Sequence, residues 1–268
     1  MPVSRRQLAQ FADKHAWQIP FDTSPRHLAG SGDARHVTHG LAAAGWSAVS
    51  DPLSAEIVMA SPDLRHRLQF DPQSRASAWW RLQAVPTLTE PGWYAEFGEL
   101  VPAEVLAAFT DALIAPPPQQ PAPWQPLTSA GWHRDADSAR SPDSMCHVEL
   151  RPLNEFHDRP SWHIETSGEA PGPRIWNAYL DEHTPTHLVG TFLSALADPA
   201  PLQRHMFDRT AHHTAAKTRS AMTPEQVVEA HTHRLAALRT RARTTRRRQP
   251  AATSPAPSPQ HGAPVARR

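Results

Sequence analysis

The amino-acid sequence predicts an α+β protein built from two tandem repeats, each an antiparallel β-sheet followed by a helix. Three observations support this fold class. A series of sequence markers occurs twice in the same order, about 80 to 86 residues apart, as expected of a duplicated unit. Within each series, apolar and polar residues alternate with the period of a strand. Each series ends in a segment whose apolar residues recur every three or four positions, as in an amphipathic helix.

The markers also define the domain organisation. In chain order they are Gly-Trp at 45–46 and 131–132, Ser-Pro-Asp at 61–63 and 141–143, the pairs Trp79/Trp162 and Trp93/Trp176, and the segments 102–117 and 185–200, which pair Phe109 with Phe192. We therefore expect an N-terminal helical flank (1–24), a first repeat (25–116), a Pro-rich linker (117–123), a second repeat (124–202), a basic helical region (203–248) and a disordered basic tail (249–268).

The N-terminal flank begins with a helix signature over residues 3–17. Ser4 and Gln7 have the spacing of a capping box, in which each side chain bonds to the other residue's backbone N–H. Val3 and Leu8 have the spacing of a hydrophobic staple. This segment is therefore expected to be a short helix.

The first repeat is expected to contain a helix, four strands and a closing helix. Residues 34–46 are typical of a short helix that ends at Gly45. Aromatic and branched residues favour strands in the four segments that follow, at 56–63, 66–71, 78–85 and 92–100. Pro102 is expected at the first position of the closing helix, since proline is favoured there.

The second repeat follows the same plan, and the chain then ends in a further helix. Strands are expected at 145–152, 161–167 and 174–180, and a closing helix from Pro185. Thr223-Pro224-Glu225-Gln226 has the pattern of a helix start, with Leu235 and Leu238 on the apolar face that follows.

Ser-Pro-Asp is expected to be a turn between the first two strands of each repeat. Proline presets the backbone for a turn, while Ser and Asp side chains bond nearby backbone amides. The residues after Asp differ between the two copies, so no common chemistry is repeated. We therefore assign a structural role to both triplets, which are Ser61, Pro62 and Asp63 in the first repeat and Ser141, Pro142 and Asp143 in the second.

Two tandem units with a Ser-Pro-Asp turn, a preceding Gly-Trp and a following "DPQSRASAWWRL" resemble the actinobacterial domain of unknown function 317, or SPDY-motif, family. The resemblance covers roughly residues 25–200. The family motif has a tyrosine after Ser-Pro-Asp, whereas this chain has Leu64 and Ser144 there. The resemblance supports the fold and implies no particular chemistry.

Composition restricts the function. The chain has one cysteine and 17 histidines, so an intramolecular disulfide and a CxxC zinc site are excluded. It contains neither a GxSxG elbow nor a Gly-rich phosphate loop, and we expect no catalytic residue, metal or cofactor. It also has no secretory signal and no apolar run long enough to span a membrane. We therefore expect a cytoplasmic protein.

Arginines at the C-terminus are the main candidates for binding. Nine arginines and no acidic residue occur from Arg234 onward, whereas the rest of the chain has 26 acidic residues. Such a tail is typical of binding to DNA or another polyanion, or of a solvated, charge-rich end that only aids solubility. Trp80 and Arg81 could add base stacking and phosphate contact on an open sheet, or Trp80 could face the core. The candidate nucleic-acid-binding residues are Arg239, Arg241, Arg243, Arg246, Arg247, Arg248, Trp80 and Arg81.

The leading hypothesis is a non-enzymatic binding protein that associates with nucleic acid or with a protein partner. One alternative is a metal-dependent hydrolase, because His183 and His187 lie four residues apart, as two metal ligands on a helix would. The other alternative is a protein–protein scaffold that does not bind nucleic acid.

Overall fold

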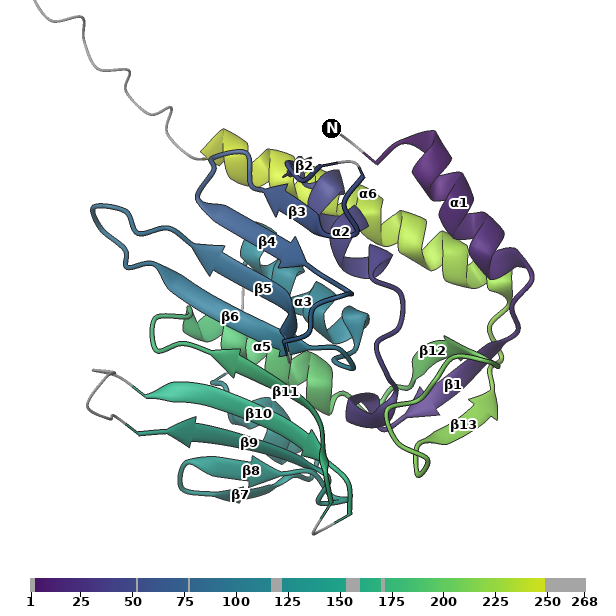
Figure 1. Ribbon diagram of the computed structural model, residues 1–268, viewed down its shortest axis with the longest axis vertical. Helices are drawn as coiled ribbons and strands as arrows, with labels where there is room; N and C mark the ends of the chain where they lie inside the picture. The colour runs from purple at the N-terminus through teal and green to yellow at the C-terminus, as the bar shows by residue number, and fades with distance from the viewer. Residues whose placement is uncertain are drawn as a thin grey trace, which may run out of the picture.

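The two expected sheets form one continuous antiparallel sheet in the computed structural model, which describes residues 3–51, 53–76, 78–116, 122–152, 160–169 and 172–248. Ten strands follow the order β2-β3-β4-β5-β6-β11-β10-β9-β8-β7 (Figure 1). Their bounds are β2 Ser47–Ala48, β3 Ile57–Ala60, β4 His66–Phe70, β5 Ala78–Ala84, β6 Trp93–Gly98, β7 His133–Asp135, β8 Ser138–Arg140, β9 Cys146–Arg151, β10 Ser161–Ser167 and β11 Arg174–Leu180. The strand order is symmetric about the β6–β11 junction.

The strand register confirms the duplication. At the junction Glu96 of the first repeat lies opposite Tyr179 of the second. Tyr179 is also the residue that corresponds to Glu96 in the duplication, 83 positions later, so an approximate twofold axis passes between them. One pairing of markers was wrong by one residue. Trp80 lies opposite Phe70 and Trp162 opposite Leu150, so the counterpart of Trp162 is Trp80 and not Trp79.

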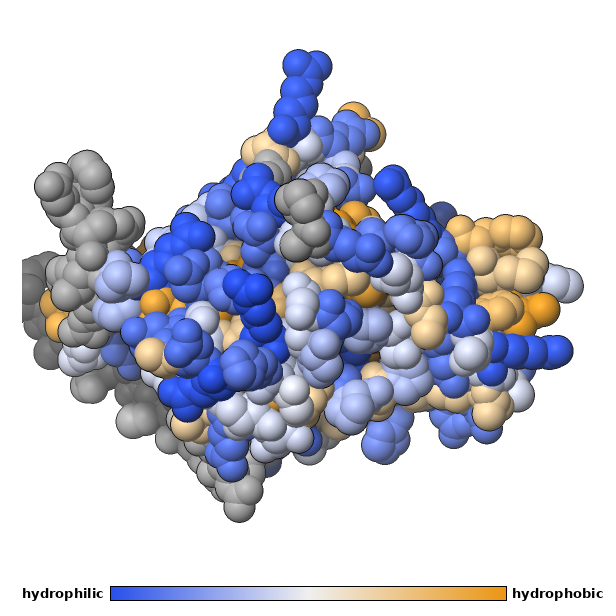
Figure 2. All heavy atoms as spheres, turned by 90° about the horizontal axis from the view of Figure 1, so that it is seen from below, coloured by the Kyte–Doolittle hydropathy of each residue, from blue (hydrophilic) through white to orange (hydrophobic). Residues whose placement is uncertain are grey.

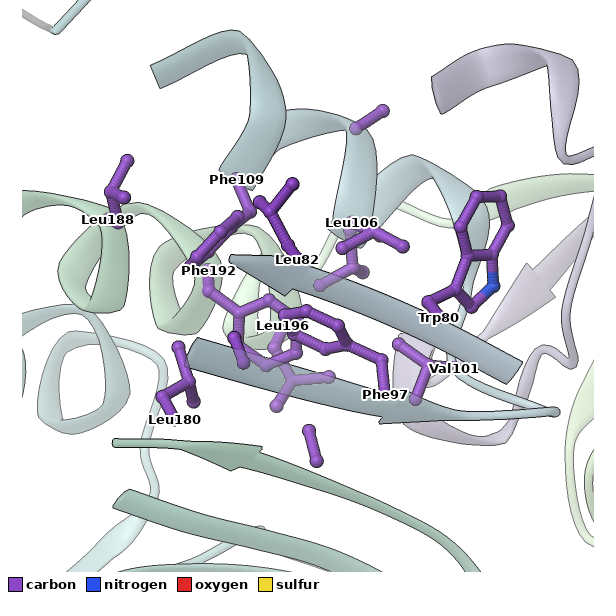
Figure 3. Close-up of a cluster of buried hydrophobic side chains, with 14 of the residues drawn as sticks. Trp80, Leu82, Phe97, Val101, Leu106, Phe109, Leu180, Leu188, Phe192 and Leu196 are labelled. Carbon is purple, nitrogen blue, oxygen red and sulfur yellow. The ribbon is translucent and has the colours of Figure 1, made fainter. Parts of the chain in front are cut away.

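Four helices cover one face of the sheet in the order α2-α3-α5-α4 (Figure 1). Their bounds are α2 Arg35–Ala43, α3 Ala103–Ile114, α4 Gln125–Ser129 and α5 Thr186–Ala197. The two closing helices meet at the twofold axis, where Phe109 and Phe192 both pack on Phe97 with ring centroids 5.5 and 5.3 Å away (Figure 3). All three rings are fully buried. The core therefore joins the two repeats into one hydrophobic layer.

The closing helices begin one residue later than expected. Pro102 and Pro185 each have an extended ψ, near 129°, and stand at the N-cap. An N-cap residue has a non-helical backbone, and the first helical residue is the next one. Gly45 follows α2 with φ of +93°, as expected for a left-handed residue that ends a helix.

The flanks assemble with each other, which the sequence analysis did not predict. Strand β1 (Pro20–Ser24) lies between β12 (Leu202–His205) and β13 (Ala216–Arg219) in a second antiparallel sheet (Figure 1). The region 203–248 is thus only partly helical. A short 3₁₀ helix, η1 (Arg26–Leu28), follows β1. Although 25–30 was assigned to the first repeat, η1 contacts the second.

The two flanking helices match their expected starts. Helix α1 (Arg5–Ala16) begins with the Ser4–Gln7 capping box, and Val3 packs near Leu8 and Leu235 as a staple would. The long helix α6 (Pro224–Arg248) begins with reciprocal bonds between Thr223 and Gln226. It packs along α1 and α2 (Figure 1). No helix of the described residues is long and apolar enough to cross a membrane.

Candidate functional site

Both Ser-Pro-Asp triplets form the same hydrogen-bonded turn. The Ser61 hydroxyl donates to Asp63 Oδ1 (2.5 Å) and accepts from the His66 backbone N–H (2.9 Å). Ser141 makes the same bonds to Asp143 (2.5 Å) and the Cys146 N–H (2.9 Å). Each hydroxyl therefore has both a donor and an acceptor partner within its own turn. The structure supports the turn assignment for both copies.

The residue after each triplet has a left-handed backbone. Its φ is +59° at Leu64 and +60° at Ser144. Leu64 is 74 % exposed, so the position at which the family motif has a tyrosine contributes no core contact in the first turn. The absence of that tyrosine therefore leaves the turn and the core intact.

The second turn has an additional partner from the N-terminal flank. The buried His27 of η1 bonds to Asp143 Oδ2 through its Nε2 (2.9 Å). Burial by itself would raise the pKa of Asp143, but the hydrogen bonds from His27 and Ser141 outweigh it and lower the pKa to about 2. The indole of Trp176 donates to the His27 carbonyl (2.8 Å). These bonds hold η1 against the second repeat.

Trp80 and Arg81 lie on opposite faces of the sheet and do not form a joint base-stacking surface. Trp80 is 3 % exposed and stacks on Phe70 under the helices, so it is a core residue and cannot stack on a base. Arg81 lies on the opposite face, where its Nε donates to Glu96 Oε1 (3.1 Å). The expectation for Trp80 was therefore wrong, because alternate residues of a strand point to opposite faces.

The expected metal ligands are not brought together into a site. His183 lies 3.7 Å from Glu182, and His187 lies on the first turn of α5. Within the described ranges, no group of three or more His, Cys, Asp or Glu side chains could hold a metal ion. The geometry of the described residues thus gives no support to the metal-dependent hydrolase.

The C-terminal arginines gather where α6 passes the end of α2. Arg239, Arg243 and Arg246 line a cavity of ≈ 290 Å³ whose other walls are Ala242 and residues 42–45. Arg246 also donates to the Ala44 carbonyl at the end of α2, where the helix dipole is negative. Among the residues that the structure describes, no acidic side chain lines this cavity. We call it the arginine cavity.

Two other predicted arginines of α6, Arg241 and Arg247, are exposed and do not line the cavity, whereas Arg239, which lines it, is half-buried. The side chain of Arg248 lies outside the described residues, as does the whole tail 249–268. The helix thus presents a positively charged surface on an otherwise acidic chain.

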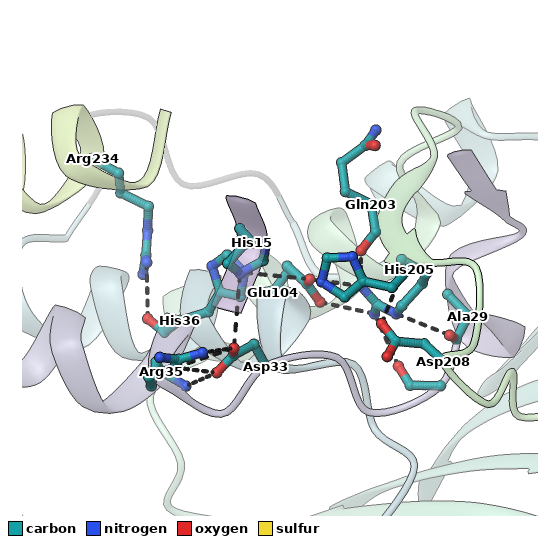
Figure 4. Close-up of polar contacts among 12 residues, drawn as sticks. His15, Ala29, Asp33, Arg35, His36, Glu104, Gln203, His205, Asp208 and Arg234 are labelled. Atoms are coloured by element: carbon teal, nitrogen blue, oxygen red, sulfur yellow. Dashed lines mark hydrogen bonds and ion pairs between the residues drawn. The ribbon is translucent and has the colours of Figure 1, made fainter. Parts of the chain in front are cut away.

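A histidine-lined cavity of ≈ 300 Å³ lies between α1, α2, α3, β12 and α6 (Figure 4). Arg204, which is 2 % exposed, forms its floor and makes a bidentate ion pair with Glu104 at 2.7 and 2.9 Å. His36 Nε2 lies 3.6 Å from the same carboxylate. The buried charges are therefore paired, and they tie β12 to α3.

Several polar atoms around this cavity are buried and make no hydrogen bond. They are His15 Nε2, Gln18 Oε1, Gln203 Oε1, His205 Nδ1 and His231 Nδ1. Buried polar groups are nearly always hydrogen-bonded, so a small polar molecule or ordered water would satisfy them. Burial lowers the pKa of His15 to about 4 and that of His231 to about 2. Both rings are neutral at pH 7, and a neutral imidazole offers one donor and one acceptor.

The histidine cavity was not predicted from the sequence. Its residues come from six elements, most of them far apart in the chain. The only sequence signal was the number of histidines in the flanks, which does not show that they converge.

Comparison with known proteins identifies the two repeats. The family model SPDY, described as "Domain of unknown function (DUF317)", matches residues 60–119 and 140–202. These regions contain β4 to α3 and β9 to α5. No curated protein and no solved structure matches the chain. The chain therefore contains two tandem regions that match the SPDY domain, whose function is unknown.

Proposed function

We propose that this chain is a non-enzymatic binding protein of the bacterial cytosol that attaches to nucleic acid, or to a similar polyanion, through the arginine cavity of α6. The observation that carries the proposal is the convergence of Arg239, Arg243 and Arg246 on one cavity without an acidic neighbour. Guanidinium groups bind phosphate oxygens in pairs of hydrogen bonds, and the cavity is open enough at the helix surface to receive a backbone phosphate.

The charge distribution supports the same surface. Residues before Arg234 include all 26 acidic residues of the chain, so an anionic ligand is repelled from most of the molecule. The sheet arginines are partly neutralised, since Arg65, Arg81 and Arg151 pair with Glu90, Glu96 and Glu149. Binding at α6 is therefore favoured over binding at the sheet.

Charge-removing substitutions test this proposal better than truncation does. Deleting residues from 234 onward would also remove Leu235 and Leu238, which are 3 % and 2 % exposed, and the Arg234–Asp111 ion pair. The chain with Arg239→Gln and Arg243→Gln keeps the side-chain stems. Its matched control carries Arg67→Gln and Arg174→Gln, two exposed positions on the sheet with the same change in net charge.

The measurement is fluorescence anisotropy of labelled single- and double-stranded DNA at low salt. We expect the α6 variant to bind at least about tenfold more weakly than the wild type, because two phosphate contacts are lost. The sheet variant is expected to keep wild-type affinity. Absence of DNA binding by the wild-type chain, or equal loss in both variants, would reject the proposal.

A further inference from the structure

A large cavity lies beside the Ser-Pro-Asp turn of the first repeat. Its volume is ≈ 590 Å³, within the range of about 300 to 1,000 Å³ that is usual for ligand pockets. We call it the first-repeat pocket. The residues that matter below are Trp46, Asp63, His66, Trp93, Thr245 and Arg246.

The corresponding place in the second repeat is filled by His27. Its ring bonds to Asp143 (2.9 Å) and lies edge-on to Trp132, with centroids 6.1 Å apart. Its backbone carbonyl accepts from the Trp176 indole (2.8 Å). A carboxylate, an aromatic wall and an indole donor thus recognise one histidine together with its peptide carbonyl.

The first repeat has the same three recognising groups. Asp63, Trp46 and Trp93 are the counterparts of Asp143, Trp132 and Trp176 in the markers of the duplication, and all three line the first-repeat pocket. No described side chain bonds to Asp63 Oδ2, and no described residue accepts a hydrogen bond from the Trp93 indole. The recognition groups are therefore present while the histidine that they would bind is not.

His66 does not replace the missing histidine. It stands at the position of Cys146 and its ring centroid lies 6.3 Å from Trp46 and 5.9 Å from Trp93. It makes no hydrogen bond to Asp63 among the described residues. His66 forms part of the wall and leaves the cavity beside it open.

The chain itself contains a second segment of the required kind. Ser-Pro-x-His occurs at 24–27, which supplies His27, and again at 258–261. Thr245 and Arg246 line the first-repeat pocket, so the C-terminal end of α6 lies next to it. Twelve residues lie between Arg248 and His261, and the thirteen extended steps from one to the other span about 45 Å. Reach is therefore ample.

We propose that the C-terminal segment Ser258–His261 docks in the first-repeat pocket, with His261 bonded to Asp63 and its carbonyl bonded to the Trp93 indole, as His27 binds in the second repeat. The occupant is the chain's own tail, which satisfies the two groups that the described residues leave without a partner. The two cavities share Arg246, but tail docking requires no anion and is measured without DNA, so the two proposals can fail separately.

The test measures competition between the tethered tail and a free peptide. A fluorescently labelled peptide with the sequence of residues 254–264 is titrated with full-length chains, and its anisotropy is recorded. The tethered tail has an effective concentration of about 1 mM. If the free peptide binds with a Kd of about 0.1 mM, the His261→Ala chain should bind it about tenfold more tightly than the wild type. The Gln260→Ala chain is the matched control and should behave like the wild type.

Two further variants test the pocket side. Asp63→Asn in the His261→Ala chain keeps the side-chain oxygen that accepts from Ser61 and replaces the other oxygen with an NH₂ group. The residue can then no longer accept a hydrogen bond from the histidine of the peptide, so we expect peptide binding to be lost. Trp93→Phe in the same chain removes the indole donor and should weaken binding. Failure of the His261→Ala chain to bind the peptide, or unchanged binding after both pocket substitutions, would overturn the proposal. A dimer that His261→Ala dissociates would also overturn it, since the tail would then occupy a neighbouring copy.

Discussion

Replacing Ser141 by alanine removes a single hydroxyl group and should nevertheless lower the free energy of unfolding strongly. The hydroxyl accepts from the Cys146 N–H and donates to Asp143 Oδ1, and Cys146 is fully buried. An unpaired buried N–H costs about 1 to 3 kcal/mol, and a hydrogen bond to a charged group contributes about 1.5 to 3 kcal/mol. Because Asp143 is 32 % exposed and water can replace the second bond in part, we expect a loss of about 2 to 4 kcal/mol.

Urea denaturation followed by circular dichroism measures this loss as a change in the free energy of unfolding, with an unchanged m-value. Ser144→Ala is the matched control, because Ser144 is exposed in the same turn and should change stability by less than about 0.5 kcal/mol. Ser61→Ala should resemble Ser141→Ala, since the two turns have equal geometry. A loss below about 0.5 kcal/mol for Ser141→Ala would refute the reasoning that the triplet holds the hairpin.

Three other properties follow from the structure. Phe109→Ala should lower the free energy of unfolding by about 3 to 5 kcal/mol, because the ring is fully buried at the junction of the two repeats; a denaturation curve within 1 kcal/mol of the wild type would contradict this role. Since the pKa of Asp143 is lowered to about 2, its contribution should be complete above pH 4 and disappear as the pH falls towards 2. In the Asp143→Asn variant, the free energy of unfolding should lack this contribution of Asp143 between pH 4 and pH 2. Burial lowers the pKa of His15 and His39 to about 4 and that of His231 to about 2, so the unfolded chain binds more protons below pH 6.5. Stability should then fall by up to about 2 kcal/mol for each of these histidines between pH 7 and pH 5, and equal stability at both pH values would disprove the buried neutral state.

The parts of the fold that depend on local pattern were predictable. Strand alternation located β4, β5, β9, β10 and β11, and the capping residues Ser4 and Thr223 located the starts of α1 and α6. Turn chemistry gave the role of Ser-Pro-Asp. Each of these signals consists of residues close together in the chain, so it can be recognised in the sequence without knowledge of the long-range contacts.

Features that depend on long-range contacts were not predictable. Strands β1, β12 and β13 are four or five residues long, and their pairing joins segments about 180 residues apart. Trp80 was predicted to bind nucleic acid because the sequence does not show which face of a strand the helices cover. The histidine cavity required both flanks to pack against helix α3 of the first repeat, where Arg204 of β12 pairs with Glu104.

The surface view adds a constraint on partners. Seen from below the orientation of Figure 1, the described surface is largely hydrophilic, with its largest group of apolar side chains at the right-hand edge (Figure 2). Over most of this face a partner would therefore meet polar and charged side chains.

Salt dependence of DNA binding tests the central claim most directly, because each phosphate neutralised by an arginine contributes about −0.9 to the slope of log K against log salt. The slope should be about 2 units less negative for the chain with Arg239→Gln and Arg243→Gln than for the wild type. The Arg67→Gln and Arg174→Gln chain should keep the wild-type slope. The same slope in the wild type and the α6 variant would contradict a phosphate site in the arginine cavity.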